Sequence, residues 1–181
     1  MIKNLLLDMG GVILNVSYQK VIESFKAYGI KDFDKVYTQA AQVEIIDLFE
    51  EGKCTPEEFR DGVRTLLKQD LTDEQIDKAW FSMILDIPKD VIRLLETLKS
   101  KYRLFLFSNT NVLHIEFLKK EFERQLGFDL FTHTFEKAFF SNEIHHRKPH
   151  PESFEYVLNA AGIRGRPKKF IGDVDLKKLD M

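Results

Sequence analysis

Five polar residues of this sequence stand just beyond short apolar segments. They are Asp8, Ser108, Asn109, Lys148 and Asp173. Two carboxylates can hold a divalent cation between them, while a lysine and a hydroxyl can grip an anion. Phosphoryl transfer needs this combination, because it requires an aligned nucleophile and neutralisation of the equatorial phosphate oxygens. Asp8 would attack and form an aspartyl-phosphate, with the backbone amides near Met9 and Gly10 as further donors.

The apolar segments before these residues predict β-strands, and helical patterns lie between them. The expected strands cover residues 2–7, 103–107, 138–140 and 169–171. One helix is expected directly after residues 87–88, and two further helices are expected at about 112–126 and 152–161. Strands that alternate with helices predict an α/β fold with a parallel, doubly wound sheet. Polar ligands bind at the carboxyl ends of such strands, so the five polar residues should converge on one edge.

A block of about 65 residues between the first two strands, near 17–82, has a helical apolar pattern and no convincing strand. Thr55 precedes a proline at the first helical position and acidic residues in the first turn. Thr72 precedes a similar acidic turn. Both are typical of helix N-termini, so the block is predicted to form a separate all-helical unit.

Four segments, in this order, match the motifs of the haloacid dehalogenase-like superfamily. They read LLLDMGGV at 5–12, LFSNTN at 106–111, RKPHP at 147–151 followed by Phe154, and FIGD at 170–173. The sequence therefore resembles that family over nearly its whole length. The segment EGKCTPEEF at 51–59 is also similar to a turn and helix start in caps of the sugar-phosphatase-like branch.

The resemblance implies a Rossmann-like three-layer core with an inserted helical cap. The core would comprise residues 1–15 and 87–181, and the cap residues 16–86. It implies a Mg²⁺-dependent phosphatase that hydrolyses a small phosphomonoester, such as a sugar phosphate.

The family's roles carry over to the matching positions. Asp8 becomes nucleophile and metal ligand, Gly10 offers its carbonyl to the metal, and Asp173 is the downstream metal ligand. Lys148 and Ser108 bind the transferring phosphate, together with the amides near Met9 and Gly10. Asn109 shapes that loop and donates hydrogen bonds.

The sequence departs from the family pattern in two places. Most phosphatases of the family carry a general acid and base two residues after the nucleophile, where this sequence has Gly10. Family members also continue beyond the fourth motif, whereas this sequence ends at Met181. We therefore expect a truncated C-terminal edge of the core, which as an uncovered edge favours a monomer or weak homodimer.

These departures keep two other functions open. One is a catalytically weak or inactive relative that binds a ligand or a partner protein. The other, which has less support, is a 2-haloacid dehalogenase. A phosphatase would lose metal-dependent hydrolysis on Asp8→Asn, a binding module would have none to lose, and a dehalogenase would release halide without magnesium.

The overall composition fits an enzyme acting on a small phosphorylated metabolite. The 27 basic and 29 acidic residues leave a formal net charge of -2, so nucleic acid is not an expected partner. No apolar run approaches the roughly 18 residues that cross a bilayer, so no membrane contact is expected. Cys54 is the single cysteine, and residues 1–7 lack a signal-peptide layout, so we expect a cytoplasmic protein.

Overall fold

A parallel sheet forms the centre of the computed structural model, which describes residues 2–30, 33, 44–163 and 170–171. Its strands are β1 (Asn4–Leu7), β2 (Arg103–Ser108), β3 (Lys137–Phe140) and β4 (Phe170–Ile171), in the order β3-β2-β1-β4. All neighbouring strands are parallel, and Leu7 lies opposite both Leu106 and Ile171. The predicted α/β fold with a parallel sheet is confirmed.

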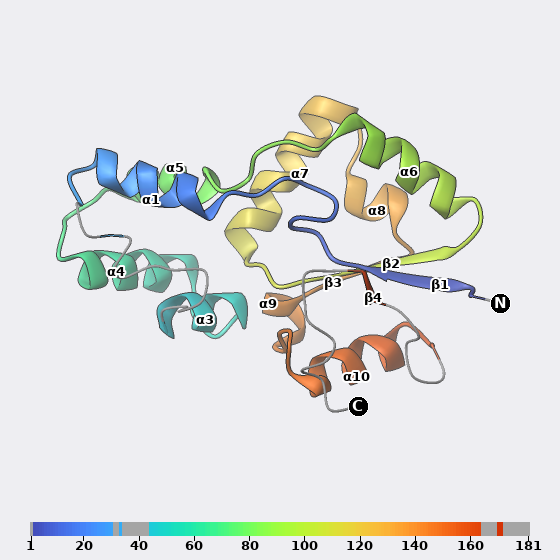
Figure 1. Ribbon diagram of the computed structural model, residues 1–181. Helices are drawn as coiled ribbons and strands as arrows, with labels where there is room; N and C mark the ends of the chain where they lie inside the picture. The colour runs from blue at the N-terminus through green and yellow to red at the C-terminus, as the bar shows by residue number, and fades with distance from the viewer. Residues whose placement is uncertain (1, 31–32, 34–43, 164–169, 172–181) are drawn as a thin grey trace.

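Side chains of β2 alternate between the two faces of the sheet, and each face has its own apolar core. Leu104 and Leu106 pack in the cluster under α6 (Lys89–Lys99), α7 (Val112–Leu126) and α8 (Leu130–Thr134). Phe105 and Phe107 pack on the opposite face, against α10 (Pro151–Ala160). Figure 1 shows these three layers edge-on, with helices on both faces of the sheet. A strand that is buried on both faces needs apolar residues at successive positions, which explains the continuous apolar sequence of β2. A short helix, α9 (Ser141–Ile144), follows β3.

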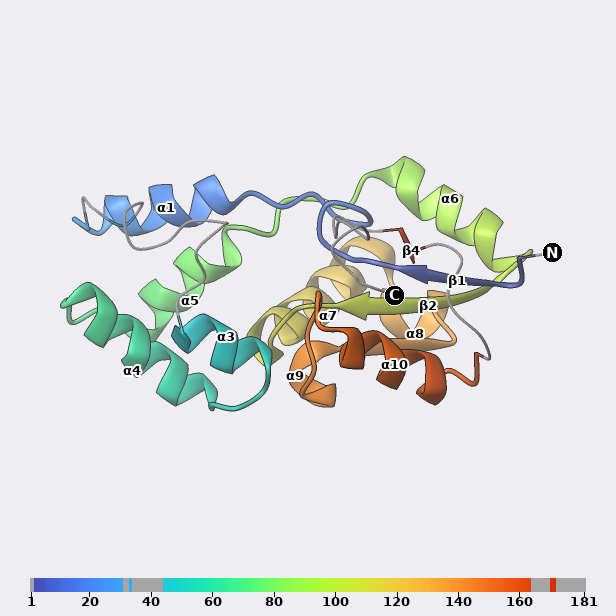
Figure 2. The same ribbon diagram turned by 60° about the horizontal axis from the view of Figure 1, so that its bottom comes forward.

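Beside the sheet lies a second part of the molecule, which is helical where the structure describes it (Figures 1 and 2). We call it the helical body: α1 (Tyr18–Ala27), α3 (Glu44–Glu50), α4 (Pro56–Leu67) and α5 (Asp73–Phe81). It has its own apolar core, in which Phe49 and Phe59 stack with ring centroids 4.3 Å apart and Trp80 lies against Phe59. Leu113 of α7 joins this core, so the helical body packs on the N-terminal end of α7.

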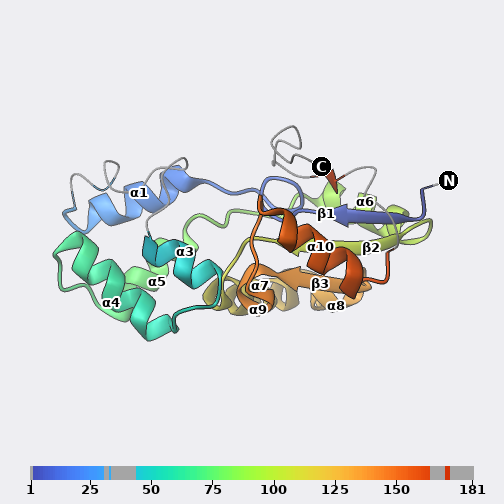
Figure 3. The same ribbon diagram turned by 90° about the horizontal axis from the view of Figure 1, so that it is seen from below.

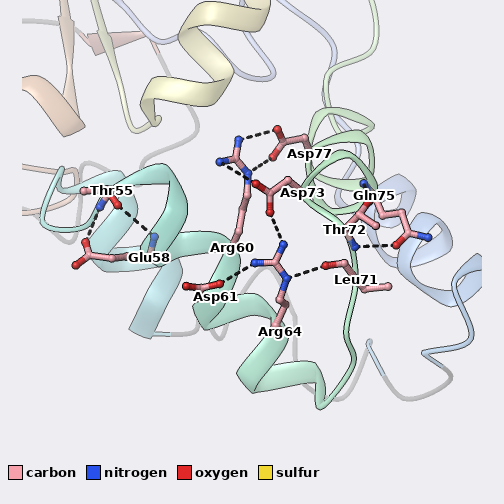
Figure 4. Close-up of polar contacts among 10 residues, drawn as sticks. All are labelled: Thr55, Glu58, Arg60, Asp61, Arg64, Leu71, Thr72, Asp73, Gln75 and Asp77. Carbon is pink, nitrogen blue, oxygen red and sulfur yellow. Dashed lines mark hydrogen bonds and ion pairs between the residues drawn. The ribbon is translucent and has the colours of Figure 1, made fainter.

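Local sequence signals start the helices of the helical body where they were predicted. Thr55 and Thr72 are both N-caps with complete capping boxes, closed by Glu58 and Gln75 respectively. Each box satisfies two amides that a helix start leaves without partners. These two predictions are confirmed (Figure 4).

Two arginines of α4 hold the turn between α4 and α5 (Figure 4). Arg60 donates to both carboxylate oxygens of Asp77, at 2.9 and 2.8 Å. Arg64 donates to Asp61, to Asp73 and, at 2.7 Å, to the carbonyl of Leu71. Both guanidinium groups reach from α4 to α5, and the bidentate pair of Arg60 with Asp77 restrains the angle between the two helices.

Two connectors join the helical body to the sheet and run antiparallel to each other. Asn15 donates to the carbonyl of Asp86 at 2.8 Å and accepts from the amide of Leu85 at 3.0 Å. Ser17 donates to the carbonyl of Met83, and Val16 pairs with Ile84. The predicted boundaries at 15/16 and 86/87 fall within these connectors, and the division into core and cap stays a prediction.

His114 of α7 is buried where the helical body meets the sheet. Its ring stacks on Trp80 with centroids 5.2 Å apart, and its Nε2 lies 3.2 Å from the Trp80 carbonyl oxygen. Nε2 therefore carries the proton, and Nδ1 accepts from the side chain of Asn111, the N-cap of α7. Burial lowers the pKa of His114 from 6.5 to about 4, against the opposing effect of the Trp80 hydrogen bond, so the ring is neutral at pH 7.

Among the residues that the structure describes, no helix has both the length and the apolar character to cross a lipid bilayer.

His114 should lower the free energy of unfolding as the pH is lowered. The effect is confined to the window between its pKa in the unfolded chain, 6.5, and its pKa in the native protein, about 4. Between pH 6.5 and about 4 the unfolded chain binds a proton at this histidine that the native protein does not. Native stability is therefore lost as pH falls, by up to roughly 3 kcal/mol from this group. Urea titrations of wild type and His114→Gln should diverge across this window, with the smaller loss in the variant; parallel curves would contradict the assignment.

Candidate active site

The carboxyl ends of the strands face the helical body. In Figure 2 the arrows of β1 and β2 both point toward it, and Figure 3 shows the same arrangement from below. The register places the ends of β2 and β3 opposite each other, at Ser108 and Phe140, and the end of β1 two residues earlier, where Leu7 lies opposite Leu106. The predicted convergence of polar residues on one edge is therefore met for those the structure describes.

Asp8 stands at the end of β1, where the chain turns sharply. The Met9 carbonyl accepts from the amide of Ile13 at 2.8 Å, and the Gly11 amide donates to Leu14. Gly11 has φ +73°, a conformation that glycine adopts without steric cost. This turn keeps Asp8 buried, at 5% exposure, with its Oδ1 accepting from the Met9 amide at 2.7 Å.

Lys148 forms an ion pair with Asp8. Its Nζ lies 2.5 Å from Asp8 Oδ2, and both side chains are almost fully buried. The ammonium also lies 5.5 Å from the ring centroid of Phe107, on the face of β2. A carboxylate and an ammonium thus meet in a site of low dielectric constant, where their attraction is strong and the loss of either partner is costly.

Asn109 holds the backbone of Lys148 from the end of β2. Its Nδ2 donates to the Lys148 carbonyl at 2.9 Å, and its Oδ1 accepts from the Lys148 amide at 2.8 Å. The side-chain amide of Asn109 therefore shapes this loop, as predicted. Contact of Asn109 with an anion would have to come from its backbone amide. Ser108 is buried next to it at the end of β2, and its hydroxyl lies 3.3 Å from the Asn109 carbonyl oxygen.

Ser141 is a structural residue that the sequence analysis missed. Its buried hydroxyl accepts from the Thr110 amide at 2.9 Å and donates to the Thr110 carbonyl at 3.0 Å. It thereby ties the loop after β2 to the start of α9. A serine after a short strand gives no sequence signal for such a contact 31 residues away.

The predicted metal site lies only partly within the described residues. Asp173 lies outside the described residues, so its predicted role as a ligand stays a prediction. Within the described ranges, no three His, Cys, Asp or Glu side chains lie close enough together to hold a metal ion. Asp8 and the Gly10 carbonyl follow β1, and both present oxygen, the donor that Mg²⁺ prefers.

Comparisons with known proteins agree with this geometry. Residues 2–174 match the family model of haloacid dehalogenase-like hydrolases. The D-ribitol-5-phosphate phosphatase of Bacteroides thetaiotaomicron is 29% identical over 174 residues, which cover 96% of this chain and 84% of that protein.

Two solved structures are also similar. A HAD family enzyme from Bacteroides thetaiotaomicron, crystallised as the wild-type protein with magnesium and inorganic phosphate, has a TM-score of 0.81 and 39% identity, covering 90% of this chain and 80% of that one. A predicted HAD-like family hydrolase from Porphyromonas gingivalis has a TM-score of 0.80 and 26% identity, covering 91% and 78%.

Asn109→Ala should destabilise the protein by about 2–4 kcal/mol, because the amide and carbonyl of Lys148 both lose their partner. Asn109→Asp keeps the acceptor for the Lys148 amide but turns a carboxylate oxygen toward the Lys148 carbonyl, so it should recover little of the lost stability. Urea unfolding monitored by circular dichroism measures both variants. Asn15→Ala, which removes an exposed side-chain hydrogen bond to Asp86, is the matched control and should stay within about 0.5 kcal/mol of wild type.

Proposed function

This chain belongs to the haloacid dehalogenase-like hydrolase family, and we propose that it is a magnesium-dependent phosphatase acting on a small phosphomonoester through an aspartyl-phosphate at Asp8. The observation that carries the proposal is the buried Asp8–Lys148 pair at the carboxyl edge of the sheet. A phosphatase among the relatives and a similar enzyme bound to magnesium and inorganic phosphate support it.

In the first step, a carboxylate oxygen of Asp8 attacks phosphorus. The ester P–O bond breaks, and its electron pair leaves on the alcohol oxygen of the substrate. Lys148 donates hydrogen bonds to the phosphate oxygens, together with the Ser108 hydroxyl and the Gly10 amide, and so offsets their charge in the transition state. The Met9 amide, which donates to Asp8 Oδ1, orients the carboxylate so that its second oxygen faces Lys148.

In the second step, water attacks the phosphorus of the aspartyl-phosphate and gives up a proton to solvent. The bond between phosphorus and the Asp8 oxygen breaks, which frees the carboxylate and releases inorganic phosphate. A buried carboxylate next to a fixed ammonium is suited to both steps, because it needs no large rearrangement between them.

Magnesium would be held by Asp8, by the Gly10 carbonyl and by Asp173. A bound magnesium ion supplies Lewis-acid stabilisation of charge on the transferring phosphoryl group. The buried carboxylate and the backbone carbonyl fit this hard cation, since both are oxygen donors.

The leaving alcohol takes its proton from water in this proposal, because Gly10 has no side chain that could donate one. General acid assistance is typically worth about 10²–10⁴-fold in rate. The enzyme should therefore be fastest with substrates whose leaving group is already a weak base.

The helical body is the proposed cap, comprising residues 16–86, over a core of residues 1–15 and 87–181. Its position opposite the carboxyl edge lets it enclose a small substrate between cap and core. A sugar phosphate or a phosphorylated sugar alcohol is the proposed substrate class, supported by the ribitol phosphate phosphatase among the relatives.

A cytoplasmic location, without nucleic acid or membrane partners and as a monomer or weak homodimer, fits this function. The near balance of 27 basic and 29 acidic residues and the single cysteine support it.

Phosphate release tests the proposal directly. Purified protein should hydrolyse p-nitrophenyl phosphate and at least one member of a panel containing D-ribitol 5-phosphate and sugar phosphates, with magnesium but not with chelator. Asp8→Asn should abolish turnover, because an amide cannot act as the nucleophile, and Asp90→Asn on the exposed start of α6 is the control that should retain it. A folded wild type without activity on any member would favour a ligand- or partner-binding role.

Gly10→Asp should raise kcat on substrates with poor leaving groups, because a carboxylic acid at this position could protonate the departing oxygen. A Cβ at residue 10 would lie 3.5 Å from Val16 Cγ1, which is ordinary van der Waals contact, so the backbone accepts a side chain. Gly10→Ala is the matched control and should fold normally without the gain. Comparison of kcat for p-nitrophenyl phosphate and for an alkyl phosphate measures the effect; an equal change for both would refute the missing-acid explanation.

A further inference from the structure

We propose that Arg147 is a positioning residue that couples contact between the helical body and the core to the placement of Lys148. Arg147 stands next to Lys148 in the chain, and its guanidinium group pairs with Asp47 and Glu50 on α3. The inference rests on the proposed function, because it assigns Lys148 a part in catalysis.

The ion pair of Arg147 with Glu50 is largely shielded from water. The Arg147 side chain is 11% exposed and that of Glu50 is 13%, and Nη2 donates to Glu50 Oε2 at 2.7 Å. Asp47, at 41% exposure, accepts from Nη1. Two carboxylates on one helix thus receive a single guanidinium from the opposite part of the molecule. Since desolvated pairs depend on geometry, this contact specifies one arrangement of α3 against the loop at 145–150.

Neighbouring contacts fix the same arrangement. His145 Nδ1 lies 2.8 Å from the carbonyl oxygen of Glu51, just after α3. Gly52 has φ +65°, and a Cβ there would lie 2.1 Å from the carbonyl oxygen of Asn142 in α9. The backbones after α3 and in α9 therefore approach so closely that only glycine fits. Figures 2 and 3 both show α3 beside α9.

Arg147 and Lys148 are anchored in different parts of the molecule. Arg147 is bound by α3, whereas Lys148 reaches Asp8 at 2.5 Å and has its backbone held by Asn109. A displacement of α3 would move Arg147. Because Lys148 is the next residue in the chain, its ammonium group would be displaced as well. Misplacement of a reacting group by about 1 Å can cost about 100-fold in rate, so this contact is expected to act on kcat.

The test compares steady-state kinetics of p-nitrophenyl phosphate hydrolysis for variants on both sides of the contact. Arg147→Ala should lower kcat by about 100-fold with little change in KM, since the loss acts on Lys148 in the transition state. Arg147→Lys should recover part of kcat, because one cation is retained. The double variant Asp47→Asn, Glu50→Gln leaves the Lys148 loop unchanged in sequence and should lower kcat to a similar degree.

Two comparisons separate positioning from general destabilisation. Combining Arg147→Ala with the α3 double variant should lower kcat no further than either alone, because both remove one coupling. Arg60→Ala removes a bidentate pair of matching burial, 12% exposed, inside the helical body, and should lower the melting temperature while retaining most of kcat.

Near wild-type kcat in Arg147→Ala, or multiplicative losses in the combined variant, would overturn the inference. If Arg147→Ala does not fold, Arg147→Lys and the α3 double variant decide: a lowered kcat in both supports the coupling, and wild-type kcat in the double variant refutes it. Failure of the proposed function is a separate result, since wild type itself would then show no magnesium-dependent phosphate release.

Discussion

The ion pair between Asp8 and Lys148 is the constraint on which the rest of the site depends. Two charged groups at about 5% exposure lose hydration worth several kcal/mol each, and their mutual attraction offsets this only when both are held in good geometry. The turn after β1 holds one group through the Met9 amide, and Asn109 holds the backbone of the other. The loops at the sheet edge are therefore fixed by polar contacts, because apolar packing alone cannot orient a charge.

The helical body contributes to this constraint from outside the sheet. Its contacts with the core include a ring stack and hydrogen bond between Trp80 and the neutral His114, and an ionic contact of α3 with Arg147. The first lies at the N-terminus of α7, which follows the loop of Ser108 and Asn109, and the second adjoins Lys148. Each contact thus reaches a different loop of the candidate active site, so a change in packing of the helical body is transmitted to both.

Much of the fold could be predicted because its signals are local. The capping boxes at Thr55 and Thr72, the continuous apolar run of β2 and the helix at 112–126 each lie within a few residues of chain. The short helices α8 and α9 were missed, since five and four residues are too few to show a helical period. Convergence of Asp8 and Lys148 followed from the rule that parallel strands present their carboxyl ends on one edge.

The contacts that could not be predicted join residues far apart in the chain. Asn109 meets the Lys148 backbone 39 residues away, and Arg147 meets Glu50 at a separation of 97 residues. An arginine before a lysine and an acidic pair on a surface helix are each ordinary in sequence, because surface ion pairs are common and mostly weak. What distinguishes this pair is its burial between two parts of the molecule, which arises only after both have folded. The arrangement of the helical body against the core is therefore specified by residues such as Arg147 and Glu50, which cannot be recognised from the sequence alone.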